Sequence, residues 1–137
     1  MAKQSEKKMC REFVKVLRQY VQYNQIARPE SFRFWHNDNG QRAGNDEHAR
    51  MLAGKEAKDL GVMRGLYDYT FLWRDAQGTP WMGFLEAKTD IGELTKEQEE
   101  FRAYCNREGI PNAEFRSVPQ GLKYLQRWGI FKEGVII

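Results

Sequence analysis

The chain of 137 residues has few of the features that mark secreted, zinc-binding or membrane-spanning proteins. Its only two cysteines, Cys10 and Cys105, lie far apart and outside any Cys-x-x-Cys spacing. This usage indicates the reduced thiols of a cytosolic protein rather than a disulfide framework or a zinc site. No apolar run approaches the roughly 18 residues of a membrane span, and the charged start MAKQSEKK does not resemble a secretory signal. We therefore expect no membrane partner.

The chain also has a low net charge and few histidines. The formal net charge is only +3, which is compatible with a nucleic-acid partner but does not indicate one by itself. The two histidines, His36 and His48, have no metal-ligand partner at a useful spacing. There is no internal repeat, and 137 residues lie near the commonest domain size of roughly 100–150. Residues 1–137 are therefore expected to form one domain.

The sequence does contain an ordered series of helix and strand patterns. We expect helices over about 6–24, 46–61, 94–109 and 119–129, and strands over 31–37, 66–73, 81–88 and 113–118. The first helix has an apolar stripe at three- and four-residue spacings, and Thr95 with Gln98 forms a capping-box pattern. The order of elements predicts an α/β or α+β domain with a small mixed sheet flanked by helices.

The two central strands form a hairpin with unusual charges. If its turn is centred at Gln77, residues whose numbers sum to 154 face each other, which pairs Asp68 with Glu86. The second strand, WMGFLEAK, reads as half-buried, and Lys88 follows Glu86 on the same face. Two carboxylates this close repel each other unless one is protonated or a divalent cation such as Mg²⁺ lies between them. An ordinary cross-strand ion pair on a solvated face explains the spacing equally well.

The residues around the hairpin resemble the VRR-NUC family (virus-type replication and repair nucleases) of the PD-(D/E)XK nuclease superfamily. Members share a Gly-Val pair, a Gly-x-x-Asp strand, a Glu-x-Lys strand and a helix entered through Ser/Thr-x-x-Gln. These appear here as Gly61-Val62, Gly65 to Asp68, Glu86-Ala87-Lys88, and Thr95 to Gln98. The resemblance spans about residues 32–118. Its one departure is Tyr67, where the family commonly has proline.

This resemblance implies a restriction-endonuclease-like αβββαβ core that hydrolyses nucleic-acid phosphodiesters with Mg²⁺ or Mn²⁺. It implies that Asp68 and Glu86 bind the metal through their side chains and that Ala87 binds it through its carbonyl. Lys88 would assist the attacking water. Gln98 is a further catalytic candidate, and a catalytic role is compatible with its role in the capping box.

Superfamily members often add a metal-binding Glu from the first helix. Glu6 lies nearer than Glu12 to the apolar stripe at 100° per residue, so Glu6 is the better candidate. Candidate nucleic-acid contacts are Arg42, Lys55, Lys58, Arg64 and His36, although each alone is more often simply solvated.

The resemblance further implies a homodimeric, structure-selective DNA endonuclease acting on branched or junction DNA. The expected location is the cytoplasm of a bacterium or of a phage-infected host cell. The alternative is a catalytically silent nucleic-acid-binding module with the same fold. Because a silent relative often loses at least one of Asp68, Glu86 and Lys88, their presence favours the enzyme.

Overall fold

The computed structural model describes residues 2–37, 47–61, 63–89 and 91–137. Its helices are α1 (Ala2–Gln22), α2 (Glu47–Asp59), α3 (Lys96–Glu108) and α4 (Val118–Arg127), with a short 3₁₀ turn η1 (Pro29–Ser31). Its strands are β1 (Arg33–His36), β2 (Tyr69–Arg74), β3 (Pro80–Ala87) and β4 (Asn112–Phe115). This order confirms the prediction of an α/β fold.

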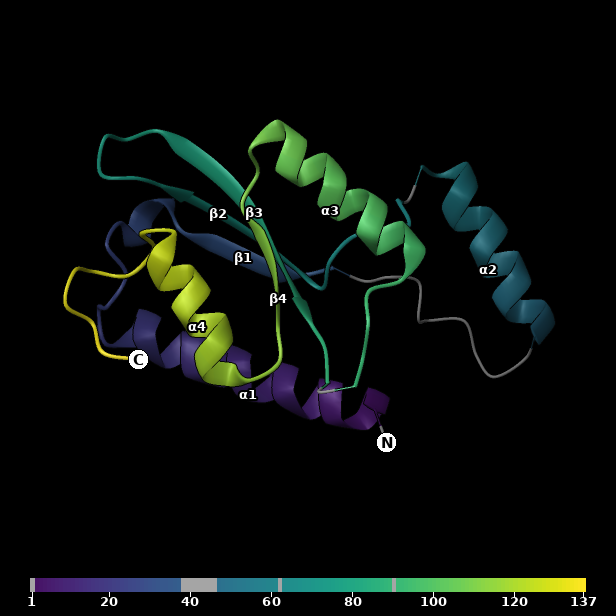
Figure 1. Ribbon diagram of the computed structural model, residues 1–137, viewed down its shortest axis with the longest axis horizontal. Coiled ribbons are helices and arrows are strands. Elements are labelled where there is room, and N and C mark those ends of the chain that lie inside the picture. Colours follow the sequence, from purple (N-terminus) through teal and green to yellow (C-terminus); the bar gives the residue numbers. More distant parts are fainter. Residues whose placement is uncertain (1, 38–46, 62, 90) are drawn as a thin grey trace.

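The four strands form one mixed sheet in the order β1-β2-β3-β4. The first two pairings are antiparallel and the pairing of β3 with β4 is parallel. Helices α1 and α4 lie together on one face of the sheet, α3 covers the other, and α2 stands apart from both (Figure 1). No helix of the described residues is long and apolar enough to cross a bilayer.

The hairpin register is the one that the sequence predicts. Trp73 pairs with Trp81 and Thr70 pairs with Phe84, so paired residue numbers sum to 154. The expectation of a half-buried second strand is wrong, because every residue from Gly83 to Lys88 is buried. Both sheet faces are covered there, since α1 and α4 pack on one and α3 packs on the other.

The apolar stripe of α1 anchors the helix across the sheet. Phe13 and Leu17 are fully buried. The ring of Phe13 lies 4.8 Å from that of Phe115 on β4 and 5.6 Å from that of Tyr69 on β2, measured between centroids. This packing fixes the distance between α1 and the strands that carry the candidate site.

Helix caps and a bend in the chain explain most of the differences between the predicted and observed ends of the helices and strands. Thr95 and Gln98 form the expected capping box, and Gly109 ends α3 in the left-handed region. The strand predicted over 113–118 ends at Phe115, because Ser117 turns out to be the N-cap of α4. The strand predicted from residue 66 begins at Tyr69, because the chain bends at Asp68.

Gly65 permits close packing just before that bend. Its φ is +81°, and a Cβ there would lie 2.5 Å from the backbone carbonyl of Glu97. Glycine is therefore required both by the backbone angle and by the approach of the chain to the start of α3. This contact holds the segment that leads to Asp68 against α3.

Candidate active site

Asp68 and Glu86 meet where β2 and β3 stop pairing. The backbone N–H of Asp68 donates to Oε1 of Glu86 over 2.9 Å, and the backbone N–H of Ala87 donates to Oδ2 of Asp68 over 2.9 Å. The two carboxylates are thus joined through backbone amides, one step beyond the last ladder pair of Tyr69 with Leu85. The sequence predicted two opposed side chains inside the ladder, whereas the bend at Asp68 puts its carboxylate just beyond the end of the β2–β3 ladder.

Glu86 is buried and surrounded by donors. Nε2 of Gln98 donates to its Oε2 over 2.8 Å, and Nζ of Lys88 lies 3.4 Å from the same oxygen. Burial, followed by the negative charge of Asp68, raises the pKa of Glu86 to about 7, although Lys88 opposes the shift. Glu86 is therefore poised between its neutral and ionised forms at neutral pH.

This pKa predicts a pH-dependent stability for the metal-free protein. Because the folded state holds the Glu86 proton more tightly than the unfolded chain, the contribution of this group to stability is full below about pH 4.5 and is lost as pH rises through about 7. The loss should be on the order of 3 kcal/mol. Urea unfolding in EDTA at pH 4.5 and pH 8 measures it. The Glu86→Ala protein should lose much less stability over this range, and an equal loss would contradict the assignment.

Asn37 holds the chain in place beside Asp68 through hydrogen bonds, a role that the sequence patterns did not indicate. Its Nδ2 donates to the carbonyl of Tyr67 and to Oγ1 of Thr70, each over 2.8 Å. Its backbone N–H donates to the carbonyl of Asp68 over 2.6 Å. Asn37 is buried, so these bonds are shielded from water and hold the bend at Asp68 in place. An asparagine directly after the short strand is the sequence signal that could have indicated it.

Glu6 reaches the same end of the sheet from α1. Its Oε1 lies 3.4 Å from the backbone N–H of Thr89, which directly follows Lys88. Arg116 holds the same turn, because its guanidinium donates to the carbonyl of Thr89. Glu12, the alternative candidate, is exposed and is not among the residues that line the groove described next.

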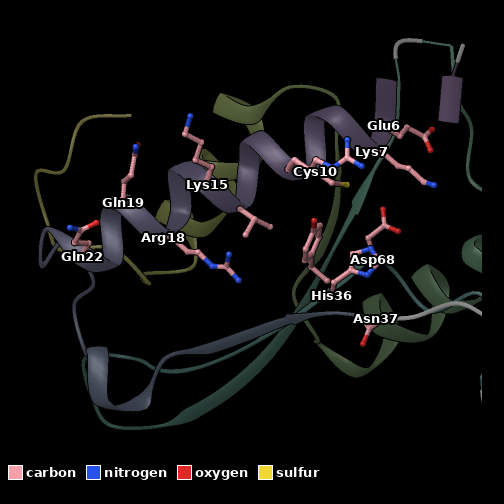
Figure 2. Close-up of a pocket in the computed structure, with 13 residues that line it drawn as sticks. Glu6, Lys7, Cys10, Lys15, Arg18, Gln19, Gln22, His36, Asn37 and Asp68 are labelled. Carbon is pink, nitrogen blue, oxygen red and sulfur yellow. The ribbon is translucent and has the colours of Figure 1, made fainter. Parts of the chain in front are cut away.

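A groove of about 770 Å³ runs between α1 and the first two strands. Glu6, Lys7 and Asp68 lie at one end of it, and His36 lies beside Asp68 (Figure 2). His36 is exposed and packs edge-on against the ring of Tyr69 at 5.1 Å. The groove therefore opens the carboxylate of Asp68 to a ligand.

The remaining candidates lie elsewhere. Lys55 and Lys58 are exposed on α2, which stands away from the groove (Figure 1). Arg64 is exposed in the turn before Gly65, and Arg42 lies outside the described residues. The structure thus brings together Asp68, Glu86, Lys88 and Gln98, and it brings Glu6 to Thr89, which directly follows Lys88.

The donor set fits a hard divalent cation. Within the described residues, no three His, Cys, Asp or Glu side chains gather into a metal site on their own. Asp68 and Glu86 supply two carboxylates, the number that Mg²⁺ commonly takes from a protein while keeping several waters. A carboxylate has about four lone-pair sites, and three donors address Glu86, which leaves capacity for a cation. The burial and mutual repulsion of the two carboxylates favour a positive ion between them.

Comparisons with protein-family models, with curated proteins and with solved structures gave no match to this chain. The resemblance to the VRR-NUC family is therefore one of sequence motifs alone.

Proposed function

We propose that this chain is a metal-dependent DNA endonuclease of the VRR-NUC type that acts on branched or junction DNA. The observation that carries the proposal is the meeting of Asp68, Glu86 and Lys88 at the adjacent ends of two paired strands. These residues come from the segments that carry the resemblance, and Gln98 from the following helix contacts Glu86 directly. A surface ion pair does not require this degree of burial or this convergence.

In this proposal Asp68 and Glu86 hold Mg²⁺ or Mn²⁺, and the carbonyl of Ala87 and the carboxylate of Glu6 are further candidate ligands. Such a cation, when bound, stabilises negative charge on a phosphodiester and promotes attack by water. Lys88 adds a positive charge beside the phosphorus and orients the attacking water. Gln98 fixes the orientation of Glu86 through its hydrogen bond. Candidate DNA contacts are His36 in the groove, and Lys55, Lys58 and Arg64 outside it. Arg42, which lies outside the described residues, is a further candidate from the sequence.

A cleavage panel tests the proposal. Labelled single-stranded, duplex, flap and four-way DNA are incubated with the protein and Mg²⁺ or Mn²⁺. We expect cleavage of a branched substrate that stops on addition of EDTA and returns with excess Mg²⁺. Binding to these DNAs without cleavage under any divalent condition would instead support the catalytically silent module.

We also predict a homodimer, because two strands of a junction require two sites and two-fold symmetry is the commonest oligomeric arrangement. The C-terminus is a poor candidate for the dimer surface, since Val135 and Ile137 pack against the core and only Ile136 is strongly exposed. Light scattering at micromolar concentration should give twice the monomer mass of 16.2 kDa. A monomer mass with full cleavage activity would exclude the dimer.

A further inference from the structure

The charged residues that line the groove beside Asp68 are separated by sign. Its α1 wall presents four basic side chains, namely Lys7, Arg11, Lys15 and Arg18. The carboxylates that line it, Glu6 and Asp68, lie together at one end (Figure 2). All four basic residues are exposed, and no carboxylate of the described residues lies within ion-pair distance of them. The positive charge along this wall is therefore open to an anion.

The charge of α1 departs from that of the rest of the chain. Residues 2–22 contain six basic and two acidic residues, whereas the other 116 residues contain sixteen basic and seventeen acidic residues. The helix thus carries a net charge of +4 within a chain of net charge +3. A solvated helix does not require this excess, whereas a polyanion-binding wall does.

The basic residues form a row along the groove. At 100° per residue, Lys7, Arg11 and Arg18 lie within an arc of about 40°, and Lys15 lies about 40° beyond it. Figure 2 agrees, because Arg18 points toward the sheet and Lys15 points away from it. From Lys7 to Arg18 the helix rises about 16 Å, which matches about five phosphates of one DNA strand at roughly 3.4 Å each.

We propose that Lys7, Arg11 and Arg18 bind the phosphate backbone of one DNA strand and lead it along the α1 groove to Asp68, with Lys15 at the rim. The inference rests on the proposed function for what happens at the acidic end of the groove. It moves the main DNA contact to α1, away from Lys55 and Lys58, which lie on a helix remote from the groove (Figure 1). Regularly spaced phosphates, rather than bases, are the groups that such a row recognises.

The test is the salt dependence of binding to a fluorescein-labelled four-way DNA junction, measured by anisotropy in EDTA. The test variant is Arg11→Gln/Arg18→Gln, which leaves Glu6, Lys7 and Asp68 intact. The control variant is Lys123→Gln/Lys132→Gln, which removes two exposed positive charges outside the groove. Far-UV circular dichroism and the Tm should match the wild type for both variants, because all four side chains are exposed.

Two lost phosphate contacts should reduce the slope of log K against log salt by about 1.8 and weaken binding roughly 60-fold at 0.1 M salt. The control variant should keep the wild-type slope. The inference is overturned if the test variant binds like the wild type, if both variants lose affinity equally, or if the wild type binds polyglutamate but not DNA.

Cleavage with Mg²⁺ then separates the two proposals. If the wild type binds DNA through the basic row but never cleaves it, this inference stands and the proposed nuclease function is refuted. If the wild type cleaves DNA and the Arg11→Gln/Arg18→Gln variant binds it normally, the nuclease function stands and this inference is refuted.

Discussion

Replacing Asp68, Glu86 or Lys88 by alanine should each lower divalent-dependent DNA cleavage by about 10³-fold or more. The two carboxylates share one cation in the proposed site, and Lys88 supplies the positive charge beside it. The fold should persist in the two carboxylate variants, because removing either carboxylate ends the repulsion between them. In Lys88→Ala the buried Glu86 loses its cationic partner but can stay protonated, because its pKa is already raised to about 7. Single-turnover cleavage of a labelled four-way junction measures the effect, and circular dichroism checks the fold.

A control variant and a Mg²⁺-binding measurement test the roles of these three residues separately. Glu99→Ala, on an exposed carboxylate next to Gln98, should cleave within about threefold of the wild type, because Glu99 does not contact the site. The Mg²⁺-induced rise in Tm should disappear in Asp68→Ala and persist in Lys88→Ala, since only the first removes a proposed ligand. A Lys88→Ala protein with full activity would remove lysine from the mechanism.

Replacing Phe13 by alanine should destabilise the protein by about 3–5 kcal/mol, the usual cost of truncating a buried phenylalanine. Phe13 is fully buried, and its ring packs against those of Tyr69, Phe71 and Phe115. Urea unfolding at pH 7 measures the change. The neighbouring Glu12→Ala should shift stability by less than about 0.5 kcal/mol, because Glu12 is exposed.

The Phe13 prediction also concerns function. Glu6 and the basic row are carried by α1, and Phe13 fixes this helix across the sheet. Cleavage by Phe13→Ala should therefore fall even at temperatures where the protein remains folded. An unchanged stability would mean that α1 is held to the sheet by other contacts.

The hairpin could be predicted from sequence because its determinants are local. A short polar turn and the alternation of side chains fix the register of Trp73 with Trp81, and the capping box at Thr95 is a pattern of four neighbouring residues. The bend at Asp68 could not be predicted, since it depends on Asn37 bonding to the chain on both sides of Asp68.

The groove could not be predicted either, because it forms between residues far apart in the chain. Arg18 and Asp68 line the same cavity only because α1 packs across the sheet. The shared face of Lys7, Arg11 and Arg18 was visible in their spacing, but nothing local indicated that a strand with a carboxylate would lie opposite.

The most direct test of the central claim compares wild-type and Glu86→Ala proteins, purified identically, on one branched DNA with Mg²⁺ and with EDTA. We predict cleavage by the wild type in Mg²⁺ alone and no cleavage by Glu86→Ala in either condition. Because Glu86 is buried and bonded to Asp68, Lys88 and Gln98, its loss should silence the whole site. Equal cleavage by the two proteins, or cleavage that survives in EDTA, would contradict the account.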